Sequence, residues 1–348
     1  MGDRVTFGIV GCGIIAENHA RAIEASPDAD LLAVADVVSE RARAFAEAHG
    51  RPQAYPDYRR LLERDDIAVV CVTVPSGLHA EVAMAAMRAG KHVLCEKPLE
   101  IRRDRLNQMI AVSETTGRQL GVVYQRRTTP VAKAAKAAVD AGDLGRLVLG
   151  DALLKYHRSA DYYRGADWRA TWALDGGGAL MNQGVHGVDL LQWLMGDIRR
   201  VSARTATLVH AIEVEDTAVA YLEFASGALG VITAATSIYP EQPTRLSVHG
   251  SQGSLVFSDR GVEEWTVRGE DVAPRMGDVA GLDFAHGHRP FIDNMVAVVR
   301  DGAQPLVPAR EGRKAVDVIL AIYESSRRGM PVVVTHGDDG ASEETSRS

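Results

Sequence analysis

A glycine-rich turn behind the first apolar run constrains the fold of this chain more than any other feature. Val5–Val10 is apolar throughout, residues 11–16 read G-C-G-I-I-A, and a helical pattern follows over Ile14–Ala25. This G-x-G-x-x-A spacing between a strand and a helix predicts a βαβ unit that binds a dinucleotide. Gly11 permits the tight turn, and Gly13 lets a pyrophosphate approach the backbone. A glycine-rich turn without a ligand is the alternative.

Strand and helix patterns alternate through the first third of the chain. Because each strand is apolar throughout, we expect a parallel sheet covered on both faces. The fold class is therefore α/β, with a doubly wound Rossmann domain over residues 1–124. The further strands are expected at Leu31–Ala35, Ile67–Val74, His92–Cys95 and Gln119–Tyr124, and the further helices at Ser39–His49 (capped by Ser39), Leu78–Ala89 and Arg103–Thr116.

The rest of the chain has a different order of elements. Several strands follow one another directly, which predicts an α+β domain with a large, open, mostly antiparallel sheet over residues 125–336. Residues 337–348 form a polar tail. The strands are expected at Leu147–His157, Val201–His210, Thr217–Phe224, Ala228–Thr236, Arg245–His249, Ser254–Phe257 and Val332–Val334, and the helices at Val131–Ala141, Ala179–Met195, Pro290–Arg300 and Arg310–Arg328.

Asp36 ends the second strand, 20 residues beyond Ala16. A carboxylate at that place accepts hydrogen bonds from the adenosine ribose and disfavours the extra phosphate of NADP, so NAD is the predicted cofactor. An exposed turn aspartate is the alternative. Arg41 would contact the adenine or, less readily, a 2′-phosphate. Further cofactor contacts are expected from the two residues after Gly13 and from the loop behind the fourth strand, namely Ile14, Ile15, Thr73, Pro75 and His79.

Two later motifs complete a recognisable set. Glu96-Lys97-Pro98 closes a strand, and Gly176-Gly177-Gly178 precedes His186-Gly187-Val188-Asp189. With the glycine motif, they make the chain resemble the Gfo/Idh/MocA oxidoreductases over its whole length. The resemblance implies a Rossmann domain and an open-sheet domain with the substrate between them. It also implies a homodimer or homotetramer, and places Glu96 and Gln125 near the cofactor.

The resemblance further implies that Lys97 and His186 are catalytic. A histidine takes a proton near neutral pH, and an ammonium stabilises developing alkoxide charge. A surface lysine and a core histidine are the alternatives. Asn182 lies four residues before His186, where several cyclitol dehydrogenases of the family have aspartate. Since an amide cannot exchange a proton, Asn182 is expected to position the substrate or the lysine. The sequence from Gly178 to Gly184 looks like the nucleotide-sugar dehydrogenase branch.

A loop rich in aromatic and arginine residues has the composition of a sugar site. Aromatic faces stack on sugar C–H surfaces, and arginines bind hydroxyls, carboxylates or phosphates. The substrate contacts are expected from Tyr163, Trp168 and Arg169, together with Asn182 and His186. Ordinary loop packing is the alternative. His286 and His288 lack a third ligand at a recognisable spacing, so no metal site is expected.

Composition and charge limit the other functional classes to which the chain could belong. The net charge of −7 gives no basic patch for nucleic acid, and the longest apolar run is too short to cross a bilayer. Three cysteines without metal-like spacing suit buried thiols in the cytoplasm. We therefore expect an NAD-dependent dehydrogenase that oxidises a secondary hydroxyl of a sugar, sugar derivative or cyclitol. A keto-sugar reductase and a redox-neutral NAD-dependent glycosidase or lyase are the alternatives.

Overall fold

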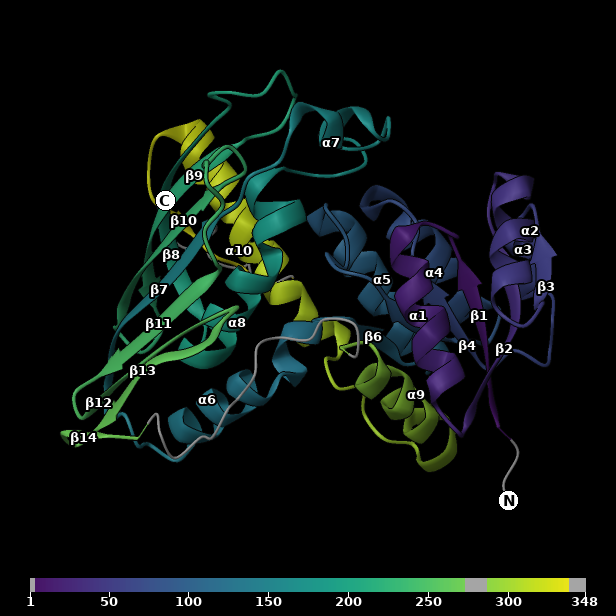
Figure 1. The fold of residues 1–348 in the computed structure, drawn as a ribbon, viewed down its shortest axis with the longest axis horizontal. Coiled ribbons are helices and arrows are strands. Elements are labelled where there is room, and N and C mark those ends of the chain that lie inside the picture. The colour runs from purple at the N-terminus through teal and green to yellow at the C-terminus, as the bar shows by residue number, and fades with distance from the viewer. Residues whose placement is uncertain (1–3, 273–286, 338–348) are drawn as a thin grey trace, which may run out of the picture. The chain divides into compact units, whose positions relative to one another are not determined.

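The computed structural model describes residues 4–272 and 287–337, and the chain divides into two compact units (Figure 1). The first unit comprises Met1–Gln125 together with Phe284–Arg313, and the second comprises Arg126–Asp283 together with Lys314–Ser348. The sequence placed a boundary after residue 124 and assigned everything from 125 to 336 to the second domain. The structure differs, because a segment from late in the chain returns to the first unit.

The first unit contains a six-stranded parallel sheet in the order β3-β2-β1-β4-β5-β6. This is the doubly wound order expected of a Rossmann domain, so the predicted fold class is confirmed. The buried faces of its strands are apolar, with Phe7, Ile9 and Cys71 fully enclosed. The strands are β1 (Val5–Val10), β2 (Ala29–Ala35), β3 (Gln53–Tyr55), β4 (Val69–Val72), β5 (His92–Cys95) and β6 (Leu120–Val122).

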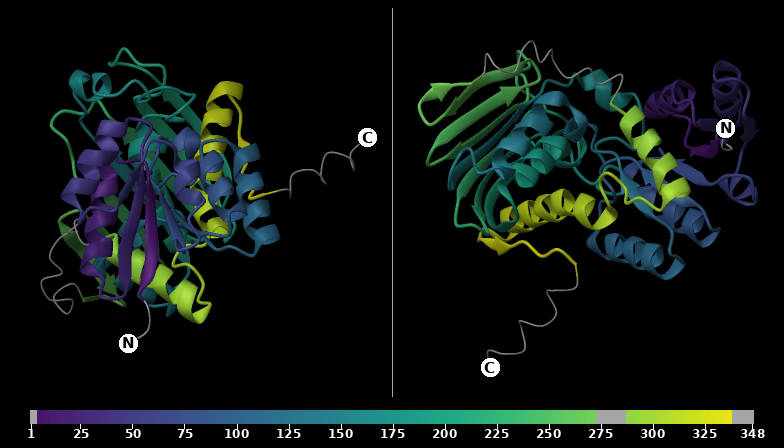
Figure 2. Two further views of the ribbon diagram at one scale, coloured as in Figure 1. Left: turned by 90° about the vertical axis from the view of Figure 1, so that its right-hand side faces the viewer. Right: turned by 90° about the horizontal axis from the view of Figure 1, so that it is seen from below.

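Helices flank this sheet on both sides (Figure 2, left). They are α1 (Ile14–Ala25), α2 (Ser39–Ala48), α3 (Tyr58–Leu62), α4 (His79–Arg88), α5 (Arg103–Thr116) and α9 (Arg289–Asp301). The predicted Ser39 cap is wrong, because Ser39 is the first helical residue and Val38 occupies the cap position without a side-chain hydrogen bond. The helix α9 is fastened to the first unit by Ser26 Oγ, which donates to Asp293 at 2.7 Å.

The second unit contains a nine-stranded sheet in the order β14-β13-β12-β11-β7-β10-β9-β8-β15. Only the β7–β10 pair is parallel among these neighbours, so the predicted mostly antiparallel sheet is confirmed. The strands are β7 (Leu147–Lys155), β8 (Ile198–Ala206), β9 (Thr217–Phe224), β10 (Leu229–Ala235), β11 (Arg245–Gly250), β12 (Gly253–Ser258), β13 (Gly261–Val267), β14 (Glu270–Asp271) and β15 (Val332–Val333).

Helices of the second unit gather on one face of its sheet (Figures 1 and 2). They are α6 (Pro130–Asp140), the short α7 (Ala160–Arg164), α8 (Val185–Met195) and α10 (Ala309–Arg328), whose first residues up to Arg313 belong to the first unit. The helix α8 packs on β7 and β11, and Ser325 of α10 accepts a hydrogen bond from Ala203 of β8. In β9, buried and more exposed side chains alternate, as in a sheet with one covered face. Within residues 4–272 and 287–337, no helix is both long and apolar enough to cross a membrane.

Candidate active site

The glycine turn between β1 and α1 has the geometry that the sequence predicted. Gly11 has φ +97°, and a Cβ atom there would lie 2.8 Å from the Thr73 carbonyl group, so only glycine fits. The position of a Cβ on Gly13 is open space, and the Ile14 side chain is 85% exposed. The first turn of α1 therefore faces an open region where its N–H groups can receive pyrophosphate oxygens.

Asp36 supports this turn from the end of β2. One of its oxygens accepts from Cys12 N and the other from Val38 N, both at 2.9 Å. Arg41 lies 3.4 Å away with a half-exposed side chain. Val37 is 87% exposed, which leaves an apolar side chain where a 2′-phosphate would need a cationic or polar partner. The residues present therefore fit NAD.

The loop behind β4 organises the same turn from the other side. Thr73 Oγ1 lies 2.6 Å from Gly11 O and 2.9 Å from Val10 O. Pro75 follows and is partly exposed. The His79 ring is buried between Val74 O and Pro98 O, at 2.9 and 2.8 Å, and burial lowers its pKa although both backbone contacts oppose this. Thr73 and His79 thus hold two loops together, and their direct contact with the cofactor stays a prediction.

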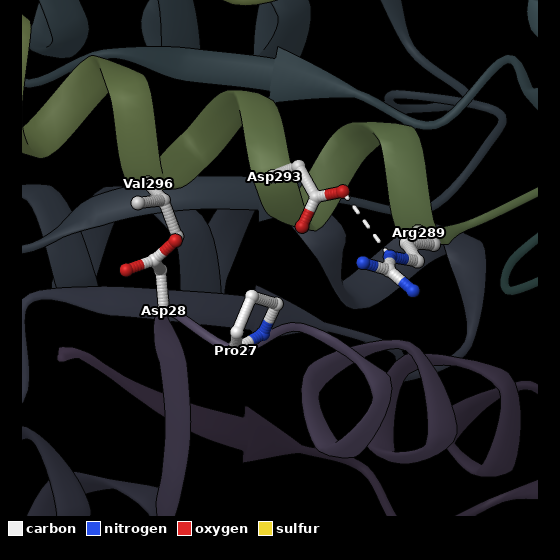
Figure 3. A pocket seen from close by; sticks show the side chains of 5 residues that line it. All are labelled: Pro27, Asp28, Arg289, Asp293 and Val296. Atoms are coloured by element: carbon white, nitrogen blue, oxygen red, sulfur yellow. Dashed lines mark hydrogen bonds and ion pairs between the residues drawn. The ribbon is translucent and has the colours of Figure 1, made fainter.

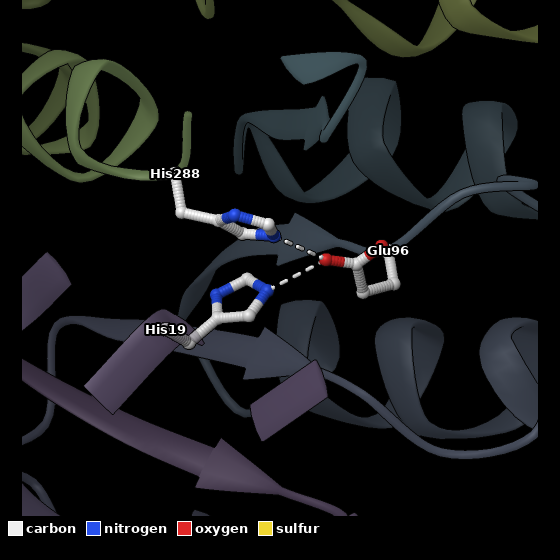
Figure 4. Close-up of side chains that lie close together, drawn as sticks. All are labelled: His19, Glu96 and His288. Carbon is white, nitrogen blue, oxygen red and sulfur yellow. Dashed lines mark hydrogen bonds and ion pairs between the residues drawn. The ribbon is translucent and has the colours of Figure 1, made fainter. Parts of the chain in front are cut away.

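Lys97 follows β5 at the carboxyl end of the sheet and is partly exposed. The preceding Glu96 is buried, and its Oε1 lies 2.9 Å from His19 Nε2 and from His288 Nε2 (Figure 4). Its Oε2 accepts from Lys97 N at 3.1 Å. Glu96 therefore has buried partners within the first unit, and its contact with the cofactor stays a prediction. The sequence also missed the partners of His288, and His286 lies outside the described residues.

In the second unit, the predicted helix over residues 179–195 is only partly α-helical. The segment η3 (Ala179–Gly184) is π-helical and leads into α8. Asn182 lies in η3 and the buried His186 in the first turn of α8, so the two do not share one regular α-helix as expected. Such π-helical turns often occur at functional sites, because they reorient side chains.

Asn182 belongs to a hydrogen-bond network that sequence reasoning missed. Its Nδ2 donates to Asp175 Oδ1, and its Oδ1 accepts from Gln183 Nε2 at 2.7 Å. Gln183 also donates to the Tyr162 hydroxyl at 2.8 Å and accepts from Arg158. Asp175 is 2% exposed, so a buried carboxylate fixes the orientation of the amide. No spacing in the sequence links Asp175 with Asn182, since a loop of unusual shape brings them together.

The third glycine of the Gly176-Gly177-Gly178 run is required by a close backbone contact. A Cβ on Gly178 would lie 2.2 Å from Glu215 O. The Glu215 carboxylate accepts from the backbone N of Gly178 and Leu180, and from the Tyr323 hydroxyl at 2.9 Å. Burial raises the pKa of Glu215, although these hydrogen bonds oppose the shift. Glu215 therefore satisfies the first N–H groups of the segment that carries Asn182.

The predicted sugar-binding residues lie in the loop around α7. Arg169 Cζ lies 4.6 Å from the centre of the Tyr162 ring and 5.4 Å from that of Trp168. The Tyr163 hydroxyl donates to Thr236 Oγ1 at 2.8 Å. Because Tyr162 contacts Gln183, this aromatic and cationic cluster is continuous with the Asn182 network. It has the side-chain types that bind hydroxyls and anionic groups.

The start of the second unit is tied to α8 by a buried ion pair. Arg127 Nε and Nη2 donate to the two oxygens of Asp189 at 2.7 and 2.6 Å. Asp189 therefore fastens α8 to the segment that begins the second unit. Gln125, a predicted cofactor contact, is the last residue of the first unit and is partly exposed.

A small cavity of about 160 Å³ lies in the first unit, beside the start of β2 and the helix α9 (Figure 3). Its lining residues are Pro27, Asp28, Arg289, Asp293 and Val296. Pro27 and Asp28 precede β2, so the cavity is at the amino ends of the strands. Ligands of doubly wound sheets bind at the opposite edge, so this cavity is not part of the candidate site.

Comparison with known proteins identifies the class. Residues 5–124 match the "Oxidoreductase family, NAD-binding Rossmann fold" and residues 132–256 match the "GFO/IDH/MocA C-terminal domain". The chain therefore belongs to the Gfo/Idh/MocA family of oxidoreductases, as the motifs indicated. It is an enzyme with an NAD-binding Rossmann domain.

Individual relatives span between 79 and 96% of the chain. Myo-inositol 2-dehydrogenase of Thermotoga maritima is 30% identical, covering 89% of this chain and 92% of the relative. The WlbA dehydrogenase of Bordetella pertussis, solved with NADH and UDP-GlcNAcA, is 31% identical with a TM-score of 0.90, covering 96% and 99%. Levoglucosan dehydrogenase of Pseudarthrobacter phenanthrenivorans is 28% identical, covering 79% of each chain.

Proposed function

We propose that this enzyme oxidises a secondary hydroxyl of a sugar, sugar derivative or cyclitol. The observation that carries the proposal is Lys97, which stands at the carboxyl end of β5 in the same unit as the NAD turn. The names of the relatives supply the substrate class, since they act on inositol and levoglucosan or were solved with a nucleotide sugar. Arg169 and Tyr162 supply matching side-chain chemistry in the second unit.

Each residue has one task in the proposed reaction. When bound, NAD supplies the acceptor for the hydride that leaves the carbinol carbon. A ring nitrogen of His186 takes the hydroxyl proton, and the Lys97 ammonium stabilises negative charge on the oxygen and relays the proton. Asn182, held by Asp175 and Gln183, orients the substrate by hydrogen bonding and moves no proton.

The first substrate to try is a UDP-linked uronic acid such as UDP-GlcNAcA. Arg158 and Arg169 lie beside the Tyr162 ring, and guanidinium groups bind carboxylates and diphosphates bidentately. The sequence of the segment from Gly178 to Gly184 also resembles the nucleotide-sugar dehydrogenase branch of the family, which favours the same substrate. The panel of test substrates also contains myo-inositol, scyllo-inositol and levoglucosan. Each reaction is run with NAD or NADP and is monitored by the absorbance of the reduced nicotinamide.

The test of the catalytic assignment is a pair of lysine substitutions. Lys97→Met should lower kcat by roughly 10²–10⁴-fold while NADH affinity changes little, because a charge that acts on the reacting oxygen is lost. Lys91, which precedes β5 and donates to Arg64 O, provides the matched control Lys91→Met. Unchanged turnover in Lys97→Met would refute the assignment. Running the assay from the ketone with NADH decides whether reduction is the faster direction.

We also propose that the chain forms a homo-oligomer through the outward face of the second sheet. Leu149, Val219, Tyr221 and Leu229 are 39, 51, 41 and 43% exposed on the adjacent strands β7, β10 and β9. Apolar side chains grouped in this way favour association with a like surface. Tyr221→Asp should yield a smaller species in light scattering, and an unchanged mass would refute the interface.

A further inference from the structure

A buried cluster in the first unit contains two histidines and one glutamate from distant parts of the chain. His19 lies on α1, Glu96 follows β5, and His288 precedes α9 (Figure 4). Both histidine Nε2 atoms lie 2.9 Å from the same oxygen, Glu96 Oε1. The two rings meet edge to face with centroids 4.9 Å apart. Every side chain of this cluster is excluded from solvent.

The hydrogen bonds determine the charge state of Glu96. Burial opposes its ionisation, but the bonds to His19 and His288 outweigh that effect and hold the pKa of Glu96 well below its usual range. Burial lowers the pKa of His19, although the bond to Glu96 opposes the shift. The cluster is therefore best described as a carboxylate that accepts an Nε2–H bond from each ring.

The second oxygen of Glu96 links the buried cluster to the backbone of Lys97. Glu96 Oε2 accepts from the backbone N of Lys97 at 3.1 Å. A carboxylate bound on one oxygen by two imidazoles has little freedom to rotate, so its other oxygen has a fixed place. The Lys97 backbone is thereby held at the carboxyl edge of the sheet, and the next residue, Pro98, is contacted by His79.

We propose that His19 and His288 are positioning residues for Lys97 and act on it through Glu96. The proposal rests on the role of Lys97 proposed above. Its consequence is that the start of α9, from late in the chain, and the dinucleotide helix α1 both control the reactive lysine. Neither histidine is expected to touch substrate or cofactor.

The same three ligand atoms lie within 4.8 Å of one another, so a divalent cation is the competing occupant. A cation on Nε2 would place a proton on each Nδ1, and metal-bound histidines almost always donate that proton to an acceptor. Among residues 4–272 and 287–337, neither Nδ1 has a hydrogen-bond partner. The hydrogen-bonded cluster is therefore favoured, and metal binding becomes an outcome of the test.

The experiment compares two substitutions of His288 in the full-length chain. His288→Leu removes the donor, whereas His288→Gln keeps an N–H group near the place of Nε2. His49→Leu is the control, because His49 is also buried in the first unit and binds two carboxylates, those of Glu17 and Glu24. The measurements are hydrogen exchange of the Lys97 amide, kcat and KM on the substrate identified above, and the zinc content of the purified protein.

We expect the Lys97 amide of His288→Leu to exchange about tenfold faster, since a carboxylate that is free to rotate protects it less. We also expect kcat to fall by roughly 10- to 100-fold with KM nearly unchanged, because small displacements of a reactive group have effects of that size. His288→Gln should restore both quantities, and His49→Leu should alter neither.

Wild-type exchange and kcat in His288→Leu would overturn the proposal. One equivalent of zinc that is lost in both His288 variants, without rescue by His288→Gln, would replace it with a metal site. If His288→Leu does not fold, His288→Asn serves instead, because its shorter amide does not reach Glu96. If wild-type protein oxidises nothing on the panel, the proposed function fails, while the exchange measurement still decides the positioning role.

Discussion

The ion pair between Arg127 and Asp189 permits a quantitative prediction about the helix that carries His186. Both bonds are short, at 2.6 and 2.7 Å, and the side chains are only 8 and 2% exposed. Replacing one partner of such a pair leaves a buried charge and costs about 3–5 kcal/mol. Asp189→Asn retains one acceptor oxygen, so we expect it to lower the free energy of unfolding by about 3 kcal/mol, the lower end of this range.

Thermal and urea unfolding of the full chain measure this loss. For a unit of this size, about 3 kcal/mol corresponds to a fall in Tm of roughly 6–12 °C. The double variant Arg127→Met/Asp189→Leu should be more stable than Asp189→Asn, because no charge stays buried. The exposed pair of Arg245 and Glu263 is the control, and Glu263→Gln should cost under about 1 kcal/mol.

Two results would refute this reasoning. One is a loss below about 1 kcal/mol in Asp189→Asn, because solvent would then be screening the pair. The other is a double variant whose loss equals the sum of the losses in the single variants Arg127→Met and Asp189→Leu, because the residues would then be energetically independent. Since Asp189 lies one helical turn beyond His186 on α8, we also expect a lower kcat in Asp189→Asn.

The remaining predictions concern pH and backbone sterics. Burial opposes the charged form of His49, but the hydrogen bonds to Glu17 and Glu24 outweigh burial and raise its pKa. The contribution of these bonds to the free energy of unfolding is therefore full below about pH 6.5, and it is lost as pH rises through the folded pKa. In urea unfolding, His49→Gln should therefore destabilise the chain more at pH 6 than at pH 9, and equal costs at the two pH values would contradict this linkage. Gly178→Ala should destabilise the chain by over about 2 kcal/mol, because its Cβ would meet Glu215 O at 2.2 Å, and wild-type Tm would contradict it.

Much of the fold was predictable because its information is local. The apolar run Val5–Val10 and the helix Ile14–Ala25 have the predicted ends, since periodicity and glycine placement determine both. The strand Gln53–Tyr55 and the helix Tyr58–Leu62 were missed because three to five residues give no clear period. The strand Gly261–Val267 was also missed, since its polar residues hide the alternation.

The candidate site was predictable only where residues act through a local motif. Gly11, Asp36 and Lys97 lie at strand ends, and the parallel sheet brings such ends to one edge. The bond of Glu96 to His288 spans 192 residues, and no spacing rule reports such a pair. Asp175 was missed for a similar reason, because its contact with Asn182 depends on the path of a loop rather than on a periodic pattern.

The return of residues 284–313 to the first unit has a consequence for the order of synthesis. A ribosome completes residue 125 roughly 10–40 s before residue 313 at about 5–20 residues per second. During that interval the nascent Rossmann domain lacks α9 and His288. The bond from His288 to Glu96 can therefore form only after most of the second unit has been translated. Translation thus delays completion of the buried cluster beside Lys97 until the chain is nearly whole.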